Sequence, residues 1–281
     1  MIIVKLSGGL GNQMFQYAFA RKLGMLKKED VKLDISGYEN DILRKYALTP
    51  FNISLQPANT EELRQIKNPY GIYSRIIRLI SKKIFRQFYI GWKPKVLLSR
   101  NKYFDGFWQS YRYFENINKI VIEELALIIP LEDAHADLVK KLTETDSVSL
   151  HVRRSDYITD KTTKKYHDIC SLDYYKSAIE IMAKNISSPK FFIFSDDINW
   201  VKENLKVPYP TEYISGTGLT ETEELIAMSK CQHNIIANST FSWWGAWLNQ
   251  NPNKIVISPR KWNNRYPKEY LDLLPTNWLK L

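Results

Sequence analysis

Two adjacent arginines are the residues of this chain whose types and spacing point most directly to chemistry. They lie in the stretch His151-Val152-Arg153-Arg154-Ser155-Asp156. Guanidinium groups keep their charge and donate paired hydrogen bonds to phosphate oxygens, so neighbouring arginines indicate an anionic substrate, and a diphosphate suits them best. A surface salt bridge between Arg154 and Asp156 would explain the same residues without any ligand, because a short motif is only a hypothesis.

Two further polar groups follow apolar runs. The carboxylates of Ser195-Asp196-Asp197 could accept hydrogen bonds from the N1–H and amine of a guanine, and the hydroxyls of Asn238-Ser239-Thr240-Phe241-Ser242 suit a phosphate at a helix start. Plain helix capping is the alternative for both groups. The Asp196-Asp197 pair could also hold a divalent metal, but the two arginines already supply positive charge. Together the three groups describe a nucleoside-diphosphate site.

Alternating apolar patterns predict the elements that position these groups. Strands are expected over 147–152, 191–194, 212–215, 233–237 and 254–258, and helices over 133–142, 171–185, 197–205, 221–230 and 243–248. This alternation indicates a parallel, doubly wound sheet. Such sheets bind ligands at the carboxyl ends of their strands, which is where the three polar groups lie.

The N-terminal region predicts a second α/β unit. A strand over 2–6, a glycine loop over 7–12, a helix to residue 26 and a strand over 31–35 form a βαβ unit. The glycine spacing differs from the dinucleotide-binding pattern. The amides of Asn12 and Gln13 could face a ligand. The stretch Ile129-Pro130-Leu131-Glu132-Asp133 marks a boundary between an N-terminal domain over 1–131 and a C-terminal domain over 132–281.

An aromatic stretch over 103–114 could form a strand and a turn that line a ligand cleft. Packing in the core is the alternative, because large aromatic side chains are usually buried.

Composition narrows the setting. The chain has 281 residues and a net charge of +10, with Cys170 and Cys231 as its two cysteines. Two cysteines make no disulfide framework, and we expect a cytoplasmic protein without signal peptide or membrane span. Residues 74–102 hold nine basic side chains and no acidic one. This segment could touch the anionic inner face of a cell membrane, bind nucleic acid, or form a solvated helix face.

Four stretches together resemble glycosyltransferase family 11, the bacterial-type α1,2-fucosyltransferases. They are LSGGLGNQMFQYAFARKL, HVRRSDY, FFIFSDD and CQHNIIANSTFSWWGAWL, spread from residue 6 to residue 248. The resemblance implies an α/β fold of GT-B type, with two Rossmann-like domains facing a cleft: the N-terminal one binds the acceptor and the C-terminal one binds GDP-L-fucose. It also implies inversion at the anomeric carbon, no required metal, and a terminal β-galactoside, possibly lipid-linked, as acceptor. The candidates for contacting that acceptor are Trp108, Gln109, Tyr111 and Tyr113.

The resemblance also implies roles for single residues. Arg153 would grip the pyrophosphate, with Arg154 beside it, and His151 and Asp196 would contact guanine. Ser239, Thr240, Phe241 and Ser242 match the loop beside the phosphates, and Asn12 matches a donor-facing position of the first loop. We therefore expect transfer of L-fucose to the 2-hydroxyl of galactose in the synthesis of a surface glycan (O-antigen or capsule).

The expected reaction is a single displacement in which Arg153 stabilises the charge on the leaving phosphate. The candidate catalytic residues are Arg153, Asp156 and His151. Asp156 is the nearest candidate for the general base, His167 and Asp168 are weaker candidates, and a base-free path stays open. Three alternatives remain: a transferase using another GDP-sugar, a noncatalytic protein that binds sugar nucleotides, and a nucleic-acid-binding protein. The last would leave the motif-rich second half without a role, so no nucleic-acid partner is expected.

Overall fold

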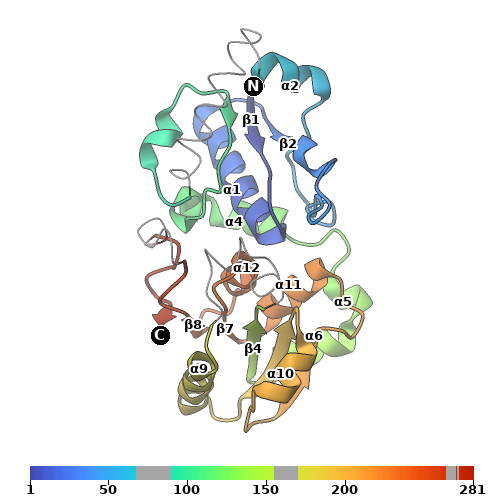
Figure 1. Cartoon of the computed structure of the whole chain (residues 1–281), viewed down its shortest axis with the longest axis vertical. Helices are drawn as coiled ribbons and strands as arrows, with labels where there is room; N and C mark the ends of the chain where they lie inside the picture. The colour runs from blue at the N-terminus through green and yellow to red at the C-terminus, as the bar shows by residue number, and fades with distance from the viewer. Residues whose placement is uncertain (68–89, 155–169, 264–269, 271) are drawn as a thin grey trace. The chain divides into compact units, whose positions relative to one another are not determined.

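The chain folds into two compact units. The computed structural model describes residues 1–67, 90–154, 170–263, 270 and 272–281. The first unit comprises Met1–Ile128 and Lys268–Pro275, and the second comprises Ile129–Pro267 and Thr276–Leu281 (Figure 1). The single boundary expected after residue 131 therefore misses a return of the chain to the first unit. That return leaves no signal in hydrophobic periodicity, because it is a tertiary contact rather than an element.

The first unit is built on a small parallel sheet. Its strands are β1 (Ile2–Lys5), β2 (Val31–Asp34) and β3 (Tyr103–Phe104), in the order β2-β1-β3. The 18-residue helix α1 (Leu10–Lys27) connects β1 to β2, as the apolar spacing predicts. The remaining segments are short: α2 (Thr60–Lys67), α4 (Asn118–Glu124) and 3-10 turns at Ser36–Tyr38, Pro94–Leu98, Tyr111–Tyr113 and Glu115–Ile117.

The second unit has a six-stranded sheet in which every pairing is parallel. Its strands are β4 (Ser147–Val152), β5 (Lys190–Ser195), β6 (Thr211–Tyr213), β7 (His233–Ile235), β8 (Val256–Ser258) and β9 (Leu279–Lys280). They are arranged in the order β6-β5-β4-β7-β8-β9. Counted from β4 this is 3-2-1-4-5-6, the order of dinucleotide-binding Rossmann sheets, and the switch point lies between β4 and β7.

Helices connect these strands as the alternation predicts. They are α5 (Leu131–Ala134), α6 (Ala136–Glu144), α9 (Leu172–Asn185), α10 (Ile198–Asn204), α11 (Glu221–Lys230) and α12 (Thr240–Leu248). The helix expected over 133–142 is interrupted at His135, so that it forms two helices. Ser171 caps α9 as predicted, since its Oγ accepts a hydrogen bond from the Tyr174 backbone N–H at 3.2 Å.

Apolar side chains of α9 and α10 pack on the central strands. Tyr175, Ile179 and Val201 belong to one buried cluster with Leu150 and Ile193. Within the described residues, no helix is long and apolar enough to cross a membrane.

Candidate active site

The two arginines follow the central strand of the six-stranded sheet. All six residues of β4 are buried, and the strand delivers Arg153 and Arg154 to its carboxyl end. On one side β5 pairs with β4 in a register that sets Val152 opposite Ser195. The next residue after each strand therefore lies at the same edge, as the sequence predicts.

Asp196 holds both arginines at this edge. Its Oδ2 lies 3.2 Å from Arg153 Nε, and its Oδ1 accepts a hydrogen bond from the Arg154 backbone N–H at 2.9 Å. The carboxylate thus fixes the backbone of one arginine and the side chain of the other. Because both arginines and Asp196 sit beyond paired strand ends, their positions are set by the rigid sheet.

Arg154 is held more tightly than the sequence indicates. Its Cζ lies 3.4 Å from the centroid of the Trp200 ring, and its Nε lies 3.5 Å from Asp197 Oδ2. Asp197 also caps α10 by accepting from the Trp200 backbone N–H at 3.3 Å. The sequence analysis missed Trp200; the only signal was an aromatic residue in the first turn of a helix beginning at this site. Asp156, the other partner considered for Arg154, lies outside the described residues, as do His167 and Asp168.

His151 is buried beneath the arginines. It is 3% exposed, and its ring centroid lies 5.5 Å from that of Phe241. Among the described residues its Nδ1 has no hydrogen-bond partner. Burial, together with the positive charge of Arg153, lowers the pKa of His151 to about 3. The imidazole is therefore neutral at physiological pH, which suits contact with a neutral ligand group, and its lowered pKa makes it a weak base.

The residues after β7 lie on the other side of β4, across the switch point. Ser239 has an extended backbone and precedes α12 without capping it through its side chain. Ser242 Oγ instead donates to the carbonyls of Ala237 and Ser239, at 3.1 and 3.2 Å. Ser242 therefore shapes the loop, whereas the Ser239 hydroxyl is not used for capping. Thr240 is half-buried, and Phe241 packs beside His151.

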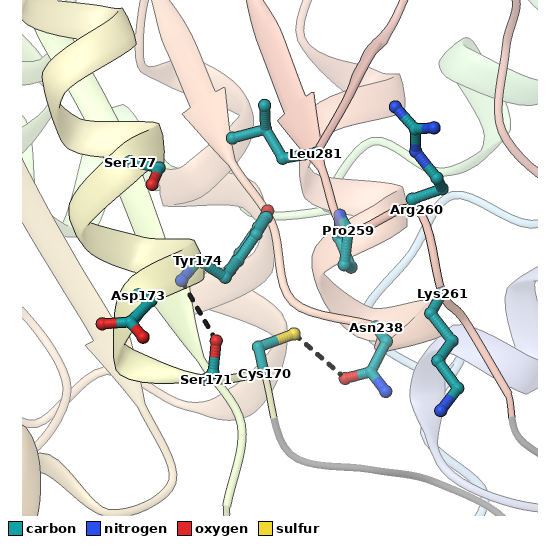
Figure 2. A pocket seen from close by; sticks show the side chains of 10 residues that line it. All are labelled: Cys170, Ser171, Asp173, Tyr174, Ser177, Asn238, Pro259, Arg260, Lys261 and Leu281. Atoms are coloured by element: carbon teal, nitrogen blue, oxygen red, sulfur yellow. Dashed lines mark hydrogen bonds between the residues drawn. The ribbon is translucent and has the colours of Figure 1, made fainter.

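A cavity of about 540 Å³ opens beside the ends of β7 and β8. Cys170 and Asn238 point toward one another at its floor, with 3.4 Å between Sγ and Oδ1 (Figure 2). Burial raises the pKa of the Cys170 thiol to about 11, so the thiol stays protonated. The sequence analysis did not identify this cavity, whose walls also include Ser171, Asp173, Tyr174, Ser177, Pro259, Arg260, Lys261 and Leu281.

The first unit brings Asn12 and Gln109 together. Gln109 Nε2 donates to Asn12 Oδ1 at 2.6 Å, at the start of α1. Gln13, expected to face a ligand, instead donates to the carbonyls of Gly8 and Lys45 at 3.0 and 2.8 Å and is fully buried. That expectation was wrong, because a helix turns successive side chains by about 100°.

Two of the aromatic acceptor candidates belong to the core. Trp108 is 1% exposed and stacks on Phe19 with ring centroids 4.1 Å apart. Tyr113 is buried, and its hydroxyl donates to the Gly91 carbonyl at 3.0 Å. Trp108 and Tyr113 therefore pack in the core, which was the alternative to acceptor binding. Tyr111 is half-buried.

Nothing in the described part of the chain gathers three or more histidine, cysteine, aspartate or glutamate side chains as a metal would require. Asp196 and Asp197, considered as metal ligands, each form an ion pair with an arginine.

Comparison with known proteins gives consistent results. The model of the family "Glycosyl transferase family 11" matches residues 1–281. An Escherichia coli protein named alpha-1,2-colitosyltransferase is 33% identical over 298 residues, which cover 100% of this chain and 99% of that protein. The Escherichia coli O-antigen biosynthesis glycosyltransferase WbnK is 33% identical over 309 residues, covering 98% of this chain and 99% of WbnK.

Solved structures show the fold. The fucosyltransferase NodZ from Bradyrhizobium aligns with a TM-score of 0.55 and 12% sequence identity over 87% of this chain and 91% of NodZ. The parallel sheets of the two units and this likeness identify the α/β fold as GT-B, as expected from the sequence.

Proposed function

Because the chain belongs to glycosyl transferase family 11, we propose that this glycosyltransferase moves L-fucose from GDP-β-L-fucose to the 2-hydroxyl of a terminal β-galactoside, with inversion. The observation that carries the proposal is the cluster of Arg153, Arg154 and Asp196 at the carboxyl edge of the Rossmann sheet. This edge is where such sheets bind nucleotides, and the guanidinium groups suit a diphosphate.

Each residue of the site is assigned to one part of the donor. Arg153 binds the pyrophosphate, and Arg154 is held by Trp200 and Asp197 as a fixed charge behind it. Asp196 and the neutral imidazole of His151 contact guanine. Ser239, Thr240 and Phe241 lie beside the phosphates, where the Ser239 hydroxyl is not used for capping, and Ser242 holds their loop.

The proposed chemistry is a single displacement at the fucose anomeric carbon. The acceptor oxygen attacks from the face opposite GDP, the bond from carbon to the β-phosphate oxygen breaks, and the electron pair leaves with GDP. Arg153 stabilises the charge that develops on the leaving phosphate, an effect that grows in a site shielded from water. Asp156 is the proposed acceptor of the hydroxyl proton. Because its lowered pKa makes it a weak base, His151 acts in recognition. No metal is required in this scheme.

The acceptor is proposed to be a galactoside-terminated glycan, possibly lipid-linked, in the synthesis of a surface glycan. The name of the relative WbnK, which refers to O-antigen biosynthesis, supports this setting. Asn12 is a proposed substrate contact, and Gln109, the other candidate on the acceptor side, lies beside it through their hydrogen bond. Trp108 is no longer proposed as a contact because it is enclosed in the core.

A second donor is favoured by a specific observation. One relative, 33% identical along its whole length, carries the name alpha-1,2-colitosyltransferase. Colitosyl transfer is therefore the alternative, with the same nucleotide site and a different sugar.

A turnover assay tests the proposal. Purified protein is incubated with GDP-L-fucose and lactose, with and without EDTA, in parallel with GDP-colitose, and the products are identified by mass and NMR linkage analysis. We expect an α1,2-linked fucosyllactose whose yield is unchanged by EDTA. Turnover of GDP-colitose alone would replace the donor, and loss of activity in EDTA would overturn metal independence. Binding of GDP without turnover of either donor would favour the noncatalytic alternative.

A further inference from the structure

The amide of Asn12 is held in one orientation by a second, buried amide. Gln109 Nε2 donates to Asn12 Oδ1 at 2.6 Å, and the Gln109 backbone N–H donates to the Ile90 carbonyl at 2.5 Å. Because Asn12 Oδ1 is occupied, its NH₂ group is directed away from Gln109. An amide that accepts on one side therefore presents two N–H donors on the other.

The backbone before Gln109 is strained in a way that fixes this contact. Trp108 has φ of 53°, in the left-handed region that bulky residues rarely adopt. Its ring is locked against Phe19 and lies edge-on to Phe104 and Tyr113. Packing of the buried ring thus stabilises an unfavourable backbone conformation at Trp108. That conformation sets the direction in which the next residue, Gln109, leaves the chain.

Gly8 keeps space for the Asn12 amide. Its φ is +83°, and a Cβ at this position would lie 2.6 Å from Asn12 Nδ2. Any side chain here would displace the NH₂ group. The glycine loop and Gln109 therefore enclose the Asn12 amide from two sides.

Gln109 is not explained as a core residue. It is 5% exposed, and among the described residues its Oε1 has no hydrogen-bond partner. An unsatisfied buried carbonyl destabilises a protein, so an apolar side chain of the same length would suit the core better. The contact with Asn12 is what the glutamine provides.

The start of α1 favours an acceptor oxygen. Gly9 precedes the helix and offers no side-chain cap, and no acidic residue lies in the first turn of this 18-residue helix. The helix dipole attracts oxygen atoms with negative charge or lone pairs. The Asn12 NH₂ group adds a directed donor at this end.

We propose that Gln109 is a positioning residue: it fixes the Asn12 amide so that its NH₂ group donates to a substrate oxygen, and it does not itself contact substrate. The proposal rests on the proposed function, in which Asn12 contacts a substrate. The oxygen belongs either to a phosphate of the sugar nucleotide or to a sugar hydroxyl, and both accept such a bond.

A double-mutant cycle tests this role on the full chain. We expect Gln109→Met to keep or raise the melting temperature. It should lower kcat/KM about 10-fold, which corresponds to the loss of about 1.4 kcal/mol from one misdirected hydrogen bond. Asn12→Ala should lose a similar factor, and the double variant should be no slower than Asn12→Ala alone. Multiplied losses in the double variant, or a melting temperature that falls with the activity, would overturn the proposal.

Gln16→Met is the matched control for stability. Gln16 is a buried glutamine of α1, the helix that also contains Asn12. Its Oε1 accepts from the Ser7 backbone N–H at 2.9 Å, and its Nε2 donates to the Gly106 carbonyl at 3.1 Å, so both ends of its amide have partners. Its replacement should lower the melting temperature, unlike that of Gln109. An equal fall for both variants would count against a special role for Gln109.

Asn12→Asp distinguishes the two sources of the oxygen. The carboxylate still accepts from Gln109 but faces the substrate with a second acceptor. If the oxygen belongs to a phosphate, the Asn12→Asp variant should turn over more slowly than Asn12→Ala and have a raised KM for the nucleotide. Opposite a sugar hydroxyl, which can donate, it should be faster than Asn12→Ala. Activity equal to wild type would overturn the need for a donor here.

One readout does not depend on the donor substrate. In protein labelled with ¹⁵N at asparagine, the side-chain signals of Asn12 are those lost in Asn12→Ala. We expect Gln109→Met to shift these signals and speed their exchange with water, even if GDP-fucose is the wrong donor. Unchanged signals would refute the positioning role whatever the outcome of the turnover assay.

Discussion

Arg153 carries the proposed chemistry at the scale of single residues. It is paired with Asp196 at 3.2 Å but sits beyond the strand end, so its removal leaves the sheet intact. We expect Arg153→Ala to lower turnover roughly 10²–10³-fold, the usual effect of deleting one group that stabilises developing charge. Steady-state kinetics with GDP-fucose measure the loss, and thermal unfolding shows that the fold survives.

Arg153→Lys is the control, because a point charge replaces a paired donor. It should recover part of the activity and restore affinity for GDP before it restores turnover. Near-normal turnover in Arg153→Ala would remove the pyrophosphate assignment.

His151 makes stability depend on pH. Its pKa is lowered to about 3 in the folded chain by burial and by Arg153, from an ordinary value near 6.5. The unfolded chain therefore binds more protons between these values, and stability falls as the pH drops through this window. Lowering the pH from 7 to 5 should reduce the free energy of unfolding by about 2 kcal/mol through this residue.

Urea unfolding of wild type and His151→Asn at both pH values measures this contribution. The variant should lose that much less stability over the same interval. Equal losses in the two proteins would show that His151 is not held neutral by burial.

At the scale of elements, close packing between α11 and α12 sets the position of the phosphate loop. A Cβ on Gly245 would lie 2.9 Å from Met228 Cβ, so only glycine fits here without movement. Gly245→Ala should destabilise the fold by roughly 1–3 kcal/mol through overpacking, despite the better helix propensity of alanine.

The same substitution should weaken binding of GDP, because α12 begins at Thr240, beside the proposed phosphate contact Ser239. Urea unfolding and calorimetric titration with GDP check the two effects. Unchanged affinity would mean that the loop does not depend on the packing of its helix. Ser229→Ala, at a half-buried position of α11 next to Met228, serves as the control.

Charge is the property that belongs to the whole molecule. The net charge is +10. The basic segment 74–102 is the part expected to touch membranes, and the structure describes its residues 90–102; the rest lies outside the described residues. In the described part, Lys95 and Arg100 are exposed, and Leu98 between them is 80% exposed. Basic and apolar groups side by side favour an anionic lipid surface.

Flotation with vesicles tests this property. We expect the protein to float with anionic phosphatidylglycerol vesicles at 0.1 M salt, not with neutral phosphatidylcholine, and to be released near 1 M salt, where charges are screened beyond about 3 Å. Lys95→Glu/Arg100→Glu should weaken the association. Equal binding to both vesicle types would exclude the electrostatic contact.

The sequence by itself determined the elements of the second unit and the composition of its site. Alternating apolar runs predicted β4, β5 and α11 closely, because burial on a sheet or a helix face imposes a local period. The convergence of Arg153, Arg154 and Asp196 also followed from the sequence, since carboxyl ends of parallel strands share one edge. The two-residue strand β9 was missed because so short a pairing has no period of its own, and β3 was expected only as one reading of the stretch 103–114.

Only the tertiary structure decided which neighbours each side chain meets. The stacking of Arg154 on Trp200, the bond from Gln109 to Asn12 across 97 positions of the chain, and the burial of Trp108 are contacts between segments whose local patterns are independent. A local pattern records whether a residue is buried, but the identity of its partner depends on how the whole chain packs. For this reason the sequence identified the proposed donor-binding residues, and the structure identified the groups that hold them.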